Sequence, residues 1–242
     1  MKILMTGGSG LLGKEILKLD SSISAPAHTE LDVTDKSSIE KNIDKFKPDV
    51  FLHVAAKTKP PEHEENPEQG IEHNIVGTAN VAQSCIKHNI RLVYTSSDYV
   101  YGGDGPHKED EGLFVPSNFL SSKIGGECAV RVHKNSLILR LSFGPMPFSW
   151  EKVYENQYNS KLYVDEMAPL VLNATKSDEV GIMNIGGPRT SLFEYAKRTR
   201  PDIENIPKPD WVPHDTSLDL TKMMKVLGVE NLEELIKHDN KK

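Results

Sequence analysis

Residues 2–13 decide the fold of this chain, and they read KILMTGGSGLLG. The apolar run Lys2–Thr6 predicts a short buried strand, and the apolar positions within Leu11–Leu19 predict a helix directly after it. Glycines stand at positions 7, 10 and 13 of the turn between them. The first glycine can take a tight turn, the second lets backbone approach a pyrophosphate, and the third lets the helix pack on the strand.

The beginning of this predicted helix is suited to an anion. Its free N–H groups and its partial positive charge favour a diphosphate at this end. We therefore predict a dinucleotide-binding turn in which Gly7, Gly10, Leu11 and Leu12 contact the cofactor. A purely structural glycine turn is the alternative.

The region that usually grips the adenosine ribose has no acidic side chain. Residues 25–29 read APAHT, whereas an NAD site commonly places a carboxylate about 20 residues after the glycines. A site without that carboxylate does not repel a 2′-phosphate, and His28 or Thr29 could contact one. The sequence thus allows NADP(H) or NAD(H) with a slight preference for NADP(H), and a plain surface role for His28 is the alternative.

Strand and helix patterns alternate along the chain. Further strands are predicted at Ile23–Ala25, Val50–Val54, Arg91–Thr95, Ser136–Leu141 and Val180–Ile185. Helices are predicted at Asp35–Phe46, Glu72–His88 and within Pro116–His133, and a terminal helical turn at Leu232–Lys237. This alternation predicts an α/β fold with a doubly wound parallel sheet, the Rossmann fold. Prolines interrupt the pattern later, so we predict an NAD(P)-binding domain over 1–143 and a small C-terminal substrate-binding annex over 144–242, with part of the last sheet strands.

Composition narrows the class of protein. The 242 residues carry a net charge of −6 without a basic cluster, which argues against nucleic acid as a partner. The two cysteines form no CxxC pattern, so neither a disulfide framework nor a zinc site is expected. No stretch approaches the roughly 18 apolar residues of a membrane span, and the first apolar run is too short for a signal peptide. A cytoplasmic protein that does not bind a membrane is expected.

The histidines show no metal-ligand spacing. Nine are present, and none forms an H-x-x-E-H or similar pattern. Surface or capping roles are predicted for His53, His63, His73 and His88, and no metal is predicted.

Several further motifs occur in a characteristic order: Leu31–Asp35 (LDVTD), Pro48–Thr58 (PDVFLHVAAKT), Asn74, Thr95–Gly102 (TSSDYVYG), Lys108–Asp110 (KED), Ser122–Glu127 (SKIGGE), Asn184–Gly187 (NIGG) and Ser217–Lys222 (SLDLTK). Together with the glycine turn they resemble the extended short-chain dehydrogenase/reductase superfamily. The similarity is greatest to its dTDP-4-dehydrorhamnose reductase-like branch of nucleotide-sugar reductases, and it runs from residue 1 to about residue 228.

The resemblance implies roles for individual residues. Ser97 falls at the catalytic Ser/Thr position and Lys123 at the catalytic lysine, which also binds the cofactor ribose. Cofactor contacts are implied for Asp32, Val33, Ala55, Ala56, Lys57 and Thr95. Substrate contacts are implied for Ser97, Asp98 and Tyr99. A small-molecule nucleotide sugar is the implied substrate, lying between the carboxyl edge of the sheet and the annex, and a homodimer is compatible with the family.

One residue departs from the pattern. The family has a tyrosine four residues before the lysine, so that both side chains share a helix face, whereas this chain has Phe119 there. In the family the tyrosine gives the proton that ketone reduction needs, and phenylalanine has none to give. Phe119 could be a deliberate Tyr→Phe change. It could be natural, with the proton coming from Tyr99, Tyr101 or a water held by Ser97. It could also mark a non-catalytic NAD(P)-binding subunit.

The sequence therefore gives one main hypothesis and two alternatives. The main one is an NAD(P)H-dependent oxidoreductase that reduces a 4-keto-6-deoxy nucleotide sugar, as in dTDP-rhamnose biosynthesis. The first alternative is a cofactor-binding regulatory subunit without turnover, and the second is an epimerase or dehydratase.

Overall fold

The computed structural model describes residues 1–115, 117–209 and 212–238. Its main sheet has five strands in the order β1-β2-β3-β4-β9. The strands are β1 (Ile3–Thr6), β2 (Val50–His53), β3 (Arg91–Thr95), β4 (Ser136–Leu141) and β9 (Gly181–Ile185). The first four pair in parallel, from Ile3 opposite Val50 at one end to Thr95 opposite Leu139 at the other. This is the predicted Rossmann-like α/β fold, and the five strands of this sheet agree with their predicted limits to within one residue at each end.

By contacts the chain divides into two compact units, each made of separate stretches of sequence. The first unit comprises Met1–Ser97, Val115–Leu139 and Asp178–Ile182. The second unit comprises Asp98–Phe114, Arg140–Ser177 and Met183–Lys242.

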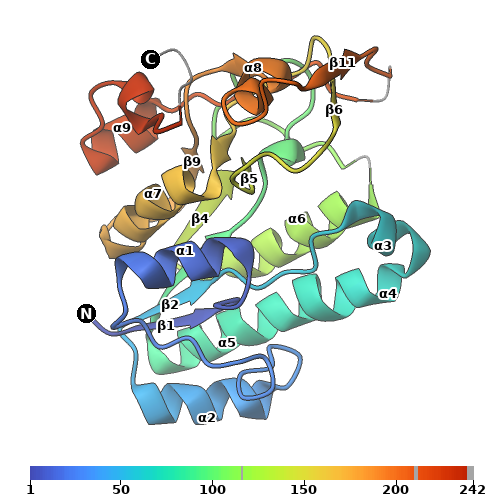
Figure 1. The fold of residues 1–242 in the computed structure, drawn as a ribbon. Coiled ribbons are helices and arrows are strands. Elements are labelled where there is room, and N and C mark those ends of the chain that lie inside the picture. Colours follow the sequence, from blue (N-terminus) through green and yellow to red (C-terminus); the bar gives the residue numbers. More distant parts are fainter. Residues whose placement is uncertain (116, 210–211, 239–242) are drawn as a thin grey trace. The chain divides into compact units, whose positions relative to one another are not determined.

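The first unit contains the glycine turn and most of the helices. They are α1 (Leu11–Leu19), α2 (Lys36–Phe46), α3 (Pro60–Glu65), α4 (Pro67–Gly70), a π-helical segment η1 (Ile71–Gly77), α5 (Thr78–His88) and α6 (Asn118–Arg131). The strands β1 and β2 run between α1 on one side and α2 and α5 on the other (Figure 1). Helices on both sides of parallel strands are what the doubly wound prediction requires.

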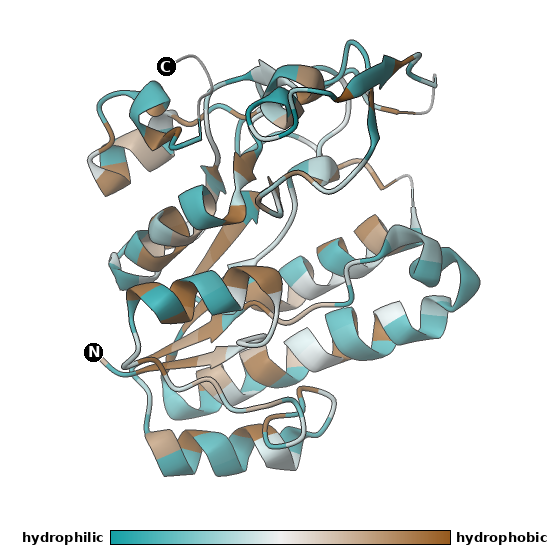
Figure 2. Cartoon of the chain, in the orientation of Figure 1, coloured by the Kyte–Doolittle hydropathy of each residue, from teal (hydrophilic) through white to brown (hydrophobic). Residues whose placement is uncertain are grey.

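The core of the first unit explains why these helices form. Ile39 and Ile43 of α2 and Val81 and Cys85 of α5 are buried against alternate side chains of the strands, among them Phe51. Helical spacing places the apolar residues of each helix on one face, and that face is buried here. In Figure 2 the strands are coloured mainly as hydrophobic, whereas the helices carry both colours.

One local prediction was wrong, and two helical segments differ from expectation. The strand predicted at Ile23–Ala25 is a single bridge, between Leu4 and Ser24. Residues 60–70, over which no helix was predicted, form α3 and α4, and a proline stands at the first turn of each, where its missing N–H costs nothing. The helix expected over Glu72–His88 begins as the π-helical segment η1 and becomes α-helical only at Thr78.

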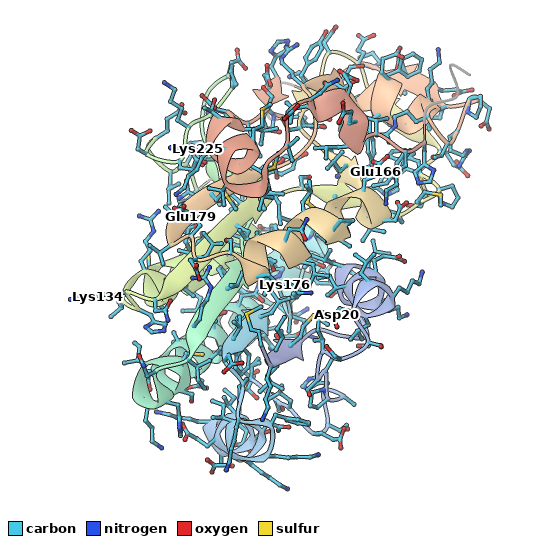
Figure 3. All side chains as sticks on the ribbon, turned by 90° about the vertical axis from the view of Figure 1, so that its left-hand side faces the viewer. Asp20, Lys134, Glu166, Lys176, Glu179 and Lys225 are labelled. Atoms are coloured by element: carbon cyan, nitrogen blue, oxygen red, sulfur yellow. The ribbon has the colours of Figure 1, made fainter. Side chains whose placement is uncertain are left out.

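The second unit has short strands and three α-helices among its described residues. The strands are β5 (Phe143–Gly144), β6 (Lys152–Tyr154), β7 (Tyr158–Asn159), β8 (Leu162–Tyr163), β10 (Thr190–Ser191), β11 (Glu204–Ile206) and β12 (Asp215–Thr216). The α-helices are α7 (Val164–Lys176), α8 (Leu192–Lys197) and α9 (Thr221–Leu227), with 3₁₀ turns at Asp98–Val100 and Leu232–Leu235. Glu166, labelled on α7 in Figure 3, is buried and pairs with Arg198. It also accepts the backbone N–H of Lys237, which holds this residue at α7.

No helix among residues 1–115, 117–209 and 212–238 has the length and apolar character needed to cross a membrane.

Candidate cofactor and catalytic site

The glycine turn at the end of β1 has little space for side chains. Gly7 has a φ of 77°, and a Cβ there would lie 2.8 Å from the backbone nitrogen of Ala55. At Gly13 a Cβ would lie 2.2 Å from the carbonyl oxygen of Gly7. The amide of Gly10 donates to the same carbonyl, at 3.0 Å. Glycine is therefore required at positions 7 and 13 for conformational and steric reasons.

The N-terminus of α1 is suited to the phosphates of a dinucleotide. Its N-cap is Gly10, and no side chain of the described residues caps the first turn. Leu11 is 44% exposed while Leu12 is buried in the core, so neither side chain brings a polar group to an anion at this end. Uncapped N–H groups at a helix N-terminus favour negative charge. The residues present thus fit a dinucleotide, and the individual contacts of Gly7, Gly10, Leu11 and Leu12 remain predictions.

The residues assigned to the adenosine end lie beside the glycine turn. A Cβ on Gly8 would lie 2.7 Å from the Cβ of Ala25. His28 is exposed, and Asp32 is half-buried. Burial alone would raise the pKa of Asp32, but hydrogen bonds from Thr34 and the nearby His28 and His73 hold it below its usual value. The side chain of Val33 lies in the core against Gly77, which leaves only its backbone for the predicted adenine contact.

Asn74 fixes the segment that follows β2. Its Oδ1 accepts the N–H of Lys57, and its Nδ2 donates to the carbonyl of Lys57, both at 2.9 Å. Nε2 of His63 also contacts that carbonyl, at 3.0 Å. Ala55 and Ala56 are half-buried in the same segment, and the side chain of Lys57 is exposed. The backbone of the predicted cofactor-side turn is therefore held rigidly, although its contact with a cofactor stays a prediction.

His53 is a second buried histidine that the sequence did not indicate. It is fully buried in β2, with Nδ1 2.8 Å from Oγ1 of Thr6 and Nε2 3.0 Å from Oγ1 of Thr78. Burial, and secondarily the charge of Lys123, lowers the pKa of His53 to about 3, so the ring is neutral. The surface or capping roles predicted for His53 and His63 were wrong, since both are buried. A histidine with two buried hydroxyl partners resembles a surface histidine in sequence.

Lys123 lies on α6 with its ammonium directed at the end of β3. It is 4% exposed, and Nζ donates to the carbonyl of Thr95 at 2.8 Å. Nζ also lies 4.5 Å from the centre of the Tyr94 ring. Burial lowers the pKa of Lys123 to about 7, and the charge of Glu127 opposes this shift. Lys123 thus changes its charge near neutral pH.

Phe119 lies in the first turn of the same helix. The helix begins after Ser117, whose hydroxyl accepts the N–H of Leu120. The Phe119 ring is half-buried and meets His63 edge-on, with centroids 5.3 Å apart. Oγ of Ser122 donates to the Phe119 carbonyl at 2.7 Å and accepts from Asn74. Phe119 is therefore a packed aromatic residue, four positions before Lys123 on α6.

The end of β3 brings three hydroxyl residues together. Thr95, Ser96 and Ser97 are all buried. Oγ1 of Thr95 donates to the carbonyl of His53 at 3.4 Å, and Oγ of Ser96 donates to Glu127 at 2.9 Å. Ser97, predicted as the catalytic hydroxyl, ends the first unit. Sequence reasoning missed Ser96 and Glu127, although Glu127 stands four residues after Lys123 and so shares its helix face.

Asp98 and Tyr99 belong to the second unit. Nε2 of Gln157 contacts the Tyr99 hydroxyl at 3.3 Å, and burial raises the pKa of Tyr99. Asp98 is buried, and its charge opposes the lowering of the Lys161 pKa that burial causes. The predicted substrate contacts of Asp98 and Tyr99 remain predictions.

Tyr101 has a structural role in the second unit. Its hydroxyl donates to Oδ1 of Asn184 at 2.7 Å and accepts from Nη1 of Arg140 at 2.8 Å. Burial raises the pKa of Tyr101 to about 12. A phenol that is engaged on both sides and weakly acidic is a poor source of a catalytic proton.

Among the described parts of the chain, no group of three or more His, Cys, Asp or Glu side chains is arranged to hold a metal ion.

The chain is similar to several known proteins. The dTDP-4-dehydrorhamnose reductase of Aggregatibacter actinomycetemcomitans is 26% identical over 95% of this chain and 94% of its own length. Methionine adenosyltransferase 2 subunit beta of Xenopus tropicalis is 32% identical over 55% of this chain, a match that spans 43% of that protein. The solved dTDP-4-dehydrorhamnose reductase of Bacillus anthracis, in complex with NADP, superposes with a TM-score of 0.83 at 22% identity. That superposition covers 97% of this chain and 98% of the other, and it confirms the fold.

The family described as RmlD substrate binding domain matches residues 1–182 of the 242. This range contains the glycine turn, the Asn74 contacts, the end of β3 and the helix with Lys123. The chain belongs to the RmlD substrate binding domain family.

Proposed function

We propose that this chain is an NAD(P)H-dependent reductase of a 4-keto-6-deoxy nucleotide sugar. The observation that carries the proposal is the buried ammonium of Lys123, fixed 2.8 Å from the Thr95 carbonyl at the end of β3. Ser97 lies two residues further along the same strand end, and the uncapped N-terminus of α1 belongs to the same unit. The similarity to a dTDP-4-dehydrorhamnose reductase over nearly the whole chain supports the substrate class.

Each part of the proposed site has its own role in binding or catalysis. The reduced nicotinamide supplies a hydride when bound. The N–H groups of Leu11 and Leu12 bind the diphosphate beside the backbone of Gly10, and Lys123 donates hydrogen bonds to the ribose. The Ser97 hydroxyl donates to the substrate carbonyl and stabilises the negative charge that grows on its oxygen.

The proton is the step in which this chain differs from its family. Phe119 cannot give one, and the Tyr101 proton is donated to Asn184. Lys123, one helical turn after Phe119, keeps a titratable proton on Nζ, and its pKa of about 7 allows release at neutral pH. Without a positioned tyrosine the reaction should be slow, since general acid catalysis is typically worth about 10²–10⁴ in rate.

NADP(H) is the cofactor that we favour. The segment after Ser24 presents Ala25 and the exposed His28 without an acidic side chain over residues 25–29. A carboxylate there would repel a 2′-phosphate, and this chain has none at those positions.

A regulatory subunit that binds NAD(P) without turnover is the second candidate. The observation in its favour is Phe119, and the similarity to a methionine adenosyltransferase subunit beta over about half of this chain supports it. In that case the dinucleotide would stabilise the fold and would not be consumed.

Two measurements separate these functions. Calorimetry with NADPH and NADH should give binding of both, with higher affinity for NADPH. Loss of the reduced-nicotinamide absorbance on adding dTDP-4-dehydrorhamnose should then be slow but should require Lys123. Absence of heat with either cofactor rejects both functions, and binding with no turnover by the chain or by Phe119→Tyr supports the regulatory one.

A further inference from the structure

Glu127 is a buried carboxylate that the proposed reaction does not use. It lies on α6 one turn after Lys123, and its side chain is 0% exposed. Oε2 accepts the hydroxyl of Ser96 at 2.9 Å. Oε1 accepts Nη2 of Arg131 at 2.7 Å and Nε of Arg131 at 3.2 Å. Burying a carboxylate costs free energy even when both of its oxygens are paired. We therefore ask what this carboxylate contributes to the site.

The Glu127 carboxylate and the Lys123 ammonium form hydrogen bonds with neighbouring residues at the end of β3. Ser96 donates to Glu127, and the carbonyl of Thr95, the preceding residue, accepts Nζ of Lys123 at 2.8 Å. The N–H of Ser96 donates to the carbonyl of Leu139 at 2.7 Å, which joins this position to β4. A movement of Ser96 would therefore move the acceptor of the lysine.

We propose that Glu127 is a positioning residue for Lys123. Through Ser96 its carboxylate fixes the end of β3 whose carbonyl receives the ammonium, and its negative charge favours the protonated lysine inside the first unit.

Two further ionisable groups near Lys123, Tyr94 and His53, are neutral. On β3, burial raises the pKa of Tyr94, so the phenol whose ring faces Nζ keeps its proton. On β2, the pKa of His53 is lowered to about 3 by burial and by Lys123 itself. Burial lowers the pKa of Lys123, whereas the negative charge of Glu127 on α6 raises it. Arg131 donates to Oε1 of the same carboxylate.

The consequence for function rests on the proposed cofactor site. A protonated Lys123 donates more hydrogen bonds to a ribose than a neutral amine does. Cofactor affinity should therefore fall as the pH rises through the Lys123 pKa, and Glu127 should determine where this fall occurs.

Two substitutions should shift the titration of Lys123 in opposite directions. Glu127→Gln keeps the size of the side chain and removes its charge, so the midpoint should fall by about one unit or more, a tenfold loss of proton affinity. Arg131→Gln removes the positive charge that is hydrogen-bonded to Oε1 of Glu127, so the midpoint should rise. The Arg131 side chain is 45% exposed. The Arg131→Gln variant is therefore expected to fold even if Glu127→Gln does not. The midpoint is read from the NMR shift of the lysine side chain in the full ligand-free chain, with the signal assigned by its loss in Lys123→Arg.

The outcomes are distinguishable from those of the proposed function. Opposite shifts support the proposal whether or not NADPH binds. An unchanged midpoint in either variant, or shifts in the same direction, overturns it, even where the unfolding temperature falls. If NADPH binds, the pH at which its affinity falls tenfold should move with the midpoint in both variants, and a fixed pH would contradict the role of Glu127 in binding.

Discussion

Asn74 holds the backbone of Lys57 through both of its polar groups, accepting the N–H and donating to the carbonyl, each at 2.9 Å. The same amide donates to Oγ of Ser122 on α6 at 2.9 Å. One side chain thus joins the turn after β2 to the helix that carries Lys123.

Asn74→Asp should loosen this turn. The carboxylate still accepts the N–H of Lys57, but it places an oxygen against the Lys57 carbonyl, which loses a donor. Replacing this hydrogen bond by two oxygens that face each other costs about 1–3 kcal/mol, even though His63 still contacts the carbonyl. The urea midpoint at pH 7 should therefore fall and NADPH should bind more weakly. Asn42→Asp is the matched control: that asparagine is 4% exposed and donates to carbonyls near α2. The control should lose stability but keep its NADPH affinity, and equal affinities in the two variants would contradict the role of Asn74.

Gly13→Ala should damage the glycine turn. The new Cβ would lie 2.2 Å from the Gly7 carbonyl oxygen, with backbone as its neighbour. Such an overlap costs roughly 1–3 kcal/mol, and displacement of α1 should weaken NADPH binding at least about tenfold, equivalent to 1.4 kcal/mol. Thermal unfolding and calorimetry measure the two effects. Gly112→Ala, where a Cβ meets nothing within 4 Å, should change neither quantity. Unimpaired binding in Gly13→Ala would disprove the close packing of α1 on the turn.

Phe119→Tyr should restore the missing acid. A tyrosine there stands one helical turn before Lys123, whose positive charge favours the phenolate. The rate of 4-keto sugar reduction should rise by about 10²–10⁴ while NADPH affinity stays within about a factor of three. Steady-state absorbance and calorimetry give these values, with Phe119→Leu as the variant that should remain slow. A gain of less than tenfold would mean that Phe119 is not what limits the reaction.

His53 should make stability depend on pH. Burial lowers its pKa from 6.5, the value expected in the unfolded chain, to about 3 in the folded state. Between these two values only the unfolded chain binds the proton. The contribution is fully present above pH 6.5 and decreases as the pH falls, by about 2 kcal/mol at pH 5. Urea unfolding of the chain and of His53→Gln at pH 8 and pH 5 measures it. Between pH 8 and pH 5 the free energy of unfolding should fall by about 2 kcal/mol less in the variant than in the unmodified chain. Equal decreases in the two chains would mean that the proton is bound at another group.

The sequence predicted the parts of the fold that periodicity and glycine govern. The strand Arg91–Thr95 and the helix Leu11–Leu19 have the predicted limits, because an apolar run and an apolar helix face are each set by nearby residues. The positions of Phe119 and Lys123 on one helix also follow from local spacing.

Buried polar contacts could not be predicted in this way. His53 is buried because Thr6 and Thr78, far away in sequence, provide its partners. Glu127 is buried because Ser96 and Arg131 pair with it. Each looks like a surface residue until the fold brings the partners together. The predicted cofactor and substrate contacts, and the division into domains at residue 143, remain predictions.

The π-helical segment Ile71–Gly77 has a consequence for related chains. A π turn contains one residue more than an α turn, and Asn74 lies in the middle of this one. Removing a single residue between 71 and 77 would let the segment relax to an α-helix while the helices on either side stay in phase, so the change falls on the residues inside the segment. Asn74 is one of them, so a homologue shortened by one position here should lose the match between its carboxamide and Lys57, and with it this joint between turn and helix, even if it retains the asparagine.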